Sequence, residues 1–235
     1  LKDKFNMKKM PLSVTYRVPK VGVENLKSLN TSVECPETAI EGVIRGGDLS
    51  DVQLGDLVIC RNTKPLITAY FSLLSQEKKA TVVGKEMEKG LLKIVNSLTG
   101  LTKEASIYQM DRSLEEIELS LSDQGIEEPK SHFKYQSLKE KLDIVSLFLD
   151  KYGSIFIVKT KIEEIFHEDK SAIKLMTCHR SKGLESDRVF FITHFDKKKL
   201  IPSKYALTPE QKQQEKNLLY VAESRFKKEM IRVRL

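Results

Sequence analysis

The fold of this protein is decided by residues 173–194, IKLMTCHRSKGLESDRVFFITH. Two apolar runs in and around this stretch, residues 172–176 and 189–193, are predicted strands. Between them, residues 177–187 bring together hydroxyl, thiol, imidazole, arginine, lysine, glycine and glutamate side chains. A strand followed by a polar, glycine-containing turn commonly presents side chains to a ligand at the carboxyl end of an α/β sheet. The stretch therefore predicts a parallel sheet and a binding site together.

The composition is that of a folded, water-exposed protein. The chain has 235 residues, 40% hydrophobic and 31% charged, which allows one large domain or two small ones. No apolar run approaches the roughly 20 residues of a membrane helix, so a membrane role is not expected. The first ten residues, LKDKFNMKKM, are basic and lack both the apolar core of a secretory signal and an initiator methionine. We therefore expect a cytoplasmic location and a fragment of a longer protein.

The cysteines argue for structure rather than chemistry. Cys35, Cys60 and Cys178 are far apart and odd in number. Cys60 and Cys178 lie in apolar, strand-like runs, so buried free thiols in a reducing cytoplasm are expected. The chain has no CxxC or HxxxH pattern on which to base a zinc site, and no metal ligand is predicted.

Positive charge is concentrated at the C-terminal end. The chain has a net charge of +7, and residues 197–235 alone contain eight Lys and three Arg against four Glu. Such a basic segment indicates an anionic partner, either nucleic acid or nucleotide. A solvated basic surface without a partner has the same composition, so charge alone leaves both readings open.

Strand and helix patterns alternate along most of the chain. Strands are predicted at residues 11–17, 56–61, 79–84 and 229–234, and helices at residues 21–29, 64–75 and 85–98. A turn is predicted where Gly42, Gly46, Gly47 and Asp48 cluster. Thr208 and Pro209 form a helix start, and that helix is expected to run to about Arg225.

Residues 101–168 have helical patterns without convincing strands, with an exposed break at residues 124–130. We therefore predict a largely parallel sheet flanked by helices and interrupted by a helical insertion. Residues 1–100 and 169–235 are the two parts of the sheet domain, and residues 101–168 are the insertion.

The common phosphate-binding loop is missing from the chain. That loop needs GxxxxGK[ST] between a strand and a helix, but the spacing from Gly42 to Gly47 is followed by Asp48. The chain also has no GxSxG nucleophile elbow. Any phosphate chemistry must therefore depend on residues of another kind.

Four segments resemble a known family. Residues 177–185 (TCHRSKGLE) resemble the TxHxxKGLE motif V of UvrD/Rep-like superfamily 1 DNA helicases, and residues 214–225 (QEKNLLYVAESR) resemble their motif VI, EERRLLYVAxTRA. Residues 15–17 (TYR) match the NYR of motif IV, and residues 57–62 (LVICRN) are similar to motif IVa. These blocks stand in the family order and cover nearly the whole chain apart from the insertion.

The resemblance implies a second RecA-like motor domain. A first motor domain, holding the P-loop and most of the Mg²⁺ site, would lie upstream as a partner in the same protein, and ATP would bind between the two. The helical segment stands where the family inserts an accessory subdomain and is much shorter than in the best-known members. This fragment alone is not expected to hydrolyse ATP.

The same resemblance assigns roles to particular residues. Arg17 and Arg225 would reach the γ-phosphate, where the planar fork of arginine can contact two oxygens. Glu185 would contact the ribose, and Gly183 would supply a backbone conformation or a close approach near the nucleotide. As alternatives, Glu185 would cap the turn and the two arginines would be solvated or paired cations.

The remaining assignments concern single-stranded DNA. Thr177 and His179 would contact the DNA strand. Lys182 would either place positive charge near the DNA backbone or hold the turn in shape. For Arg61, at the end of a central strand, a structural role and a contact to a DNA phosphate both stay open. Tyr220 is expected to be core rather than a stacking platform.

The chain departs from the family pattern in ways that matter. Gln214 and Asn217 replace Glu and Arg in motif VI, Phe226 replaces Ala, and Ser186 replaces Phe after GLE. We expect nucleotide sensing to persist with weaker supporting ion pairs. Two other functions stay open: the motor of a helicase–nuclease subunit for recombination or repair, and a non-catalytic module that binds DNA or protein.

Overall fold

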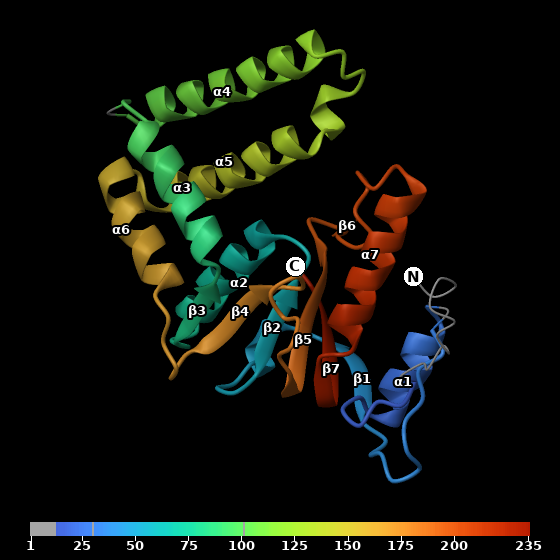
Figure 1. The fold of residues 1–235 in the computed structure, drawn as a ribbon. Coiled ribbons are helices and arrows are strands. Elements are labelled where there is room, and N and C mark those ends of the chain that lie inside the picture. Colours follow the sequence, from blue (N-terminus) through green and yellow to red (C-terminus); the bar gives the residue numbers. More distant parts are fainter. Residues whose placement is uncertain (1–12, 30, 101) are drawn as a thin grey trace, which may run out of the picture.

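A parallel sheet forms the centre of the molecule. The structure is a computed structural model that describes residues 13–29, 31–100 and 102–235. The strand order is β1-β7-β5-β2-β4-β3, and neighbours in this order run parallel (Figure 1). The strands are β1 (Val43–Gly47), β2 (Leu57–Cys60), β3 (Ala80–Val83), β4 (Ile173–Thr177), β5 (Ser186–Phe195) and β7 (Phe226–Arg234). The short β6 (Lys198–Lys199) pairs antiparallel with β5. The predicted RecA-like α/β fold class is thereby confirmed.

Helices cover both faces of the sheet. On one side lie α2 (Thr63–Ser75), α3 (Lys85–Ser97), α5 (Phe133–Tyr152) and α6 (Ile155–Phe166), with α4 (Lys103–Asp123) beyond them; on the other lie α1 (Lys20–Lys27) and α7 (Pro209–Glu223) (Figure 1). Two short 3₁₀ segments are η1 (Leu49–Asp51) and η2 (Pro129–Ser131). No helix in the described ranges is both long and apolar enough to cross a lipid bilayer.

Alternating side chains of the central strands build two cores. In β5, Phe190 and Ile192 pack toward α2 and α5, whereas Val189 and Phe191 pack toward α7. All four are fully buried, as expected for a strand covered on both faces of a parallel sheet. The second core, which includes Leu218 and Ala222, fixes the position of α7 along the strands, and Arg225 follows two residues after the end of this helix.

Two of the predicted cysteines are part of these cores. Cys60 and Cys178 are both fully buried, and all three cysteines are free. Burial raises the pKa of the Cys60 thiol to about 12, so the thiol stays protonated at neutral pH. The expectation that these two cysteines are buried free thiols is confirmed.

The helical segment joins the core on one face. The described part of the predicted segment, residues 102–168, contains α4, α5 and α6, and the predicted break falls between α4 and α5; Leu101 lies outside the described residues. Phe148 and Ile162 belong to the same hydrophobic cluster as the sheet residues. The division into a motor domain and an insertion stays a prediction.

The predicted strand at residues 11–17 is wrong for its described residues. Pro11 and Leu12 lie outside the described residues, and Val14 makes only an isolated bridge to Glu34. The hydroxyl of Thr15 accepts hydrogen bonds from the backbone of Arg17 and Val18 at 3.3 and 3.5 Å. This local side-chain contact bends the chain and competes with strand pairing.

The predicted turn around Gly42–Asp48 is also wrong. Residues 43–47 form β1, the edge strand, which pairs with β7 in parallel register. Gly42, with φ +73°, precedes the strand, while Gly46 and Gly47 lie within it. Glycine weakens a strand but is tolerated at a sheet edge, and the partner strand supplies the pairing that no local pattern shows.

The helix start at Thr208 is confirmed. The Thr208 hydroxyl accepts from the backbone of Gln211 at 3.2 Å, the Gln211 side chain accepts from the backbone of Thr208 at 3.0 Å, and Pro209 begins the helix. This capping box fixes where α7 begins. The helix ends at Glu223, two residues before the predicted end, so Arg225 stands just beyond it.

Candidate functional site

The turn after β4 connects opposite edges of the sheet. Because β4 and β5 are both parallel to β2, β4 ends with Thr177 at the carboxyl edge of the sheet, whereas β5 begins with Ser186 at the amino edge. Four residues of β2 span roughly 13 Å at about 3.3 Å per residue, so the turn must cross that distance. Residues 178–185 therefore bring different side chains to two separate surfaces.

Local hydrogen bonds hold the turn in shape. The Thr177 carbonyl accepts from the backbone of Arg180 and Ser181 at 2.9 and 3.0 Å, and the buried Ser181 hydroxyl donates to the Cys178 carbonyl at 2.8 Å. Gly183 has φ +84°, a conformation that favours glycine. Nothing in the described residues lies within 4 Å of where its Cβ would stand. Gly183 thus supplies the backbone conformation that was predicted, and it faces open space.

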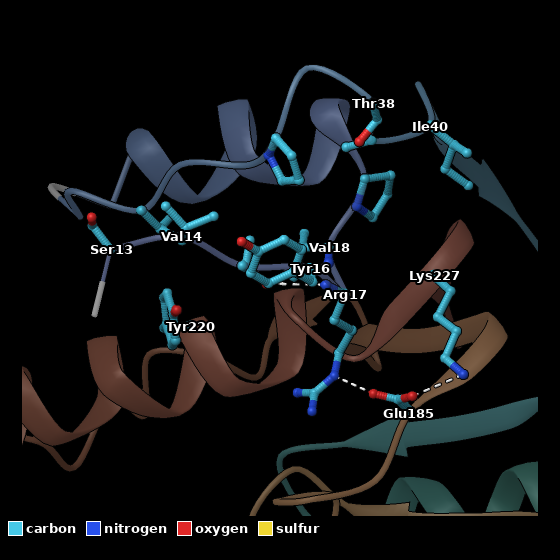
Figure 2. A pocket seen from close by; sticks show the side chains of 15 residues that line it. Ser13, Val14, Tyr16, Arg17, Val18, Thr38, Ile40, Glu185, Tyr220 and Lys227 are labelled. Atoms are coloured by element: carbon cyan, nitrogen blue, oxygen red, sulfur yellow. Dashed lines mark hydrogen bonds and ion pairs between the residues drawn. The ribbon is translucent and has the colours of Figure 1, made fainter.

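At the amino edge, one carboxylate lies between two cations. Arg17 Nε donates to Glu185 Oε2, and Lys227 Nζ donates to Glu185 Oε1 at 2.8 Å (Figure 2). The hydrogen bonds from Lys227 and then Arg17 hold the pKa of Glu185 below its ordinary value, so it is ionised at neutral pH. These three residues come from the segment before α1, the turn and β7.

This cluster borders a surface pocket of about 860 Å³. Its lining includes Tyr16 and Tyr220 as well as the loop around Thr38 (Figure 2). Tyr16 is exposed over 88% of its surface, whereas Tyr220 is half-buried and packs against the cluster around α1. The structure thus offers one solvent-facing aromatic ring beside a cationic group.

Arg225 lies behind this cluster and is buried. Its Nη1 donates to the Ser181 and Leu184 carbonyls at 3.3 and 3.1 Å, its Nε to the Val221 carbonyl at 2.7 Å, and its Nη2 to the Ser224 hydroxyl at 2.8 Å. Burial, and next the positive charge of Arg17, lower the pKa of Arg225. An arginine still remains protonated at neutral pH. The guanidinium therefore ties the end of α7 to the turn.

The carboxyl edge holds a second group of residues. Thr177 is paired with Cys60 across the strands, and Arg61 follows Cys60. Arg61 binds Glu215 of α7 through both Nε and Nη2, with Nη2 2.8 Å from Oε1. Glu215 also accepts from the Ser203 backbone at 2.8 Å. Arg61 thus has the structural partner that the sequence left open, while its contact with DNA stays a prediction.

Glu215 is charged although it is only 7% exposed. Burial alone would raise its pKa, but the hydrogen bonds from Arg61 and from the Ser203 backbone outweigh burial, and the pKa of Glu215 is lowered. The ion pair therefore links β2 to α7 despite the departures elsewhere in residues 214–225. Glu215 stands where the EERR pattern of motif VI has its second Glu, and sequence reasoning did not use this signal.

His179 and Lys182 are on the outer side of the turn, and both side chains are exposed. Partial desolvation of the imidazole, and next the positive charge of Arg61, lower the pKa of His179 from its ordinary value of 6.5. The imidazole is therefore neutral at pH 7. A neutral ring can accept or donate a hydrogen bond without adding charge.

The structure separates the predicted site residues into two groups. Arg17, Glu185 and Arg225 lie at the amino edge, whereas Arg61, Thr177 and His179 lie at the carboxyl edge. Gly183 and Lys182 lie in the turn between them. Sequence reasoning missed Lys227, which lies outside the recognised motifs, and it assigned no role to Glu215.

Comparison with known proteins identifies a relationship over most of the chain. Residues 60–233 match the family model described as UvrD-like helicase C-terminal domain. A search of curated proteins finds no match. The matched residues include the turn after β4, all of α7 and Arg225, and they exclude Arg17.

Proposed function

This chain belongs to the UvrD-like helicase C-terminal domain family and is a superfamily 1 helicase motor domain, and we propose that it is the second half of an ATP-dependent DNA translocase or helicase. One observation carries the proposal. The turn of residues 178–185 joins a cationic cluster at one sheet edge to a polar group at the other. Such a turn can couple a nucleotide to a DNA strand.

The amino edge is the proposed nucleotide surface. Phosphoryl transfer requires positive charge at the phosphate oxygens in the transition state. Arg17 and Arg225 would supply it to ATP held mainly by an upstream P-loop domain, and Glu185 would accept hydrogen bonds from the ribose. The fit rests on Arg17 and an ionised Glu185, which line an open pocket, and on the positive charge of the buried Arg225 near Arg17. Mg²⁺ would be held mainly by the upstream domain.

The contacts that Arg225 makes in this structure show which hydrogen bonds it must give up to reach a phosphate. Its guanidinium nitrogens all donate to groups of this chain. To contact a phosphate, Arg225 must exchange some of the Ser181 and Leu184 carbonyl contacts for phosphate oxygens. The turn would lose a restraint when the arginine moves, and this links nucleotide binding to the shape of the turn.

The carboxyl edge is the proposed surface for single-stranded DNA. Thr177 can donate to a phosphate oxygen, neutral His179 can pack against or bond to the strand, and Lys182 can add positive charge. Arg61 would stiffen this edge through Glu215 and add charge nearby. A movement of residues 178–185 would therefore change the grip on DNA.

The test is DNA-stimulated ATP hydrolysis by the full-length protein with Arg225→Ala. Removing an arginine that stabilises the phosphoryl transition state is expected to lower kcat by about 10³-fold. Circular dichroism must show that the variant is folded, and Arg225→Lys tests whether charge alone suffices. Near-normal DNA-stimulated turnover in folded Arg225→Ala would remove the assignment. Absence of a GxxxxGK[ST] motif upstream in the same reading frame would favour a binding module instead.

A further inference from the structure

Lys227 occupies a position that the known motifs leave without a role. It lies in β7, two residues after Arg225, and lines the same pocket as Arg17 and Glu185 (Figure 2). Its ammonium nitrogen lies 2.8 Å from Oε1 of Glu185, whereas Arg17 donates to Oε2. The two cations thus use different oxygens of one carboxylate and need not displace each other.

This division matters if Arg17 is to reach a phosphate. An arginine that transfers from a carboxylate to a phosphate leaves the carboxylate with fewer hydrogen bonds and a freer rotamer. Within the part of the chain that the structure describes, Glu185 has no second arginine partner, but Lys227 can stay on Oε1 while Oε2 becomes available. A lysine can do this because its ammonium is a compact positive charge on a flexible stem and needs only one carboxylate oxygen.

We propose that Lys227 is a positioning residue that holds Glu185 in place for the ribose of ATP when Arg17 moves to the polyphosphate. The inference rests on the proposed function. Because Lys227 acts through Glu185 in both the ground state and the transition state, its loss weakens nucleotide binding more than the chemical step.

The geometry also indicates what Lys227 does not do. The side chains of Lys227 and Glu185 are 44% and 35% exposed. Exposed ion pairs contribute little to folding stability because solvent screens the charges. Replacement of Lys227 should therefore leave the melting temperature nearly unchanged, and this separates positioning from a structural role.

The experiment compares steady-state ATP hydrolysis by full-length variants at saturating single-stranded DNA. Lys227→Met is expected to raise KM for ATP by about three- to tenfold, as for the loss of a charge-assisted hydrogen bond, with kcat changed less than about twofold. Lys227→Arg should restore KM to near the parent value. Lys228→Met is the matched control, because Lys228 is the adjacent lysine, is exposed and pairs with Asp187 at 2.6 Å.

A double-mutant cycle separates positioning from direct contact. In a Glu185→Gln background, Lys227→Met should have almost no further effect on KM. An undiminished effect there would mean that Lys227 contacts the nucleotide itself and would overturn the inference. An unchanged KM in Lys227→Met, or an equal rise in Lys228→Met, would overturn it as well.

The two levels of the proposal fail differently. If Arg225→Ala abolishes turnover while Lys227→Met is normal, only the role of Lys227 is refuted. If the parent protein shows no DNA-stimulated ATP hydrolysis, the proposed function falls and the role of Lys227 falls with it.

Discussion

The guanidinium of Arg225 donates to the backbone carbonyl of Leu184 at 3.1 Å, which ties the segment just beyond the end of α7 to the residue before Glu185. The two residues are 41 positions apart in the chain. Through this contact, the end of motif VI and the end of motif V become one structural unit. A residue proposed to sense the nucleotide is therefore also part of the support for the turn.

Arg225→Ala should lower the stability of this chain as well as activity. The substitution removes the hydrogen bonds that a buried, charged guanidinium donates to three carbonyls and one hydroxyl, so we expect a loss of about 2 kcal/mol in the free energy of unfolding. Urea denaturation followed by circular dichroism measures this loss. Arg180→Ala is the control, since Arg180 lies in the same turn with an exposed side chain. Equal stability of the two variants would contradict the contact pattern.

Gly183→Ala should destabilise the chain through its backbone alone. At φ +84° an alanine is strained by about 1 kcal/mol, although the space around its Cβ is open. Gly46→Ala is a matched control, because its Cβ would also meet nothing within 4 Å but its φ is not in the left-handed region. In thermal unfolding experiments, only Gly183→Ala should have a lower Tm than the parent protein. An equal decrease in Tm for Gly46→Ala would argue against backbone strain.

The Arg61–Glu215 pair predicts a specific pH dependence. A carboxylate whose pKa is lowered on folding stabilises the native state above its ordinary pKa of 4.5, and this contribution is lost as the pH falls through the lower, folded-state pKa. Glu215→Gln should therefore cost stability at pH 7, and the difference from the parent should shrink below about pH 4.5. Urea unfolding across this range measures the difference. Glu37→Gln, at an exposed position, controls for the loss of one negative charge.

Salt dependence should distinguish Lys182 from His179 in DNA binding. Loss of one phosphate contact to a single strand reduces the slope of log affinity against log salt by about 0.7. Lys182→Ala should show this change, whereas His179→Ala at pH 8 should weaken binding at an unchanged slope because the imidazole is neutral. Fluorescence anisotropy with an oligonucleotide and the full-length protein provides the measurement.

Lys228→Ala, which removes the same charge at the opposite sheet edge, is the control for this series. A slope change of equal size in Lys228→Ala would mean that DNA senses overall charge. In that case, the carboxyl edge would lose its assignment as the DNA surface.

Much of the fold could be predicted because strong local patterns survived folding. The strands predicted at residues 172–176 and 189–193 are observed as β4 (Ile173–Thr177) and as part of β5, and Thr208 with Pro209 begins α7 as expected. Apolar periodicity and capping are local properties, so one segment is enough to reveal them. The errors at residues 13–17 and in β1 arose where a side-chain contact or a distant partner strand outweighed local preference.

The sequence by itself determined the alternation of strands and helices, the polar turn between β4 and β5, and the family resemblance through residues 177–185 and 214–225. Only the tertiary structure decided that Arg17 meets Glu185 across 168 positions, that Lys227 shares the same carboxylate, and that Arg61 binds Glu215. The physical reason is that these ion pairs depend on the order of the strands and on the position of α7 along the strand direction. Both are set by packing between elements that are distant in the chain, which no single segment encodes.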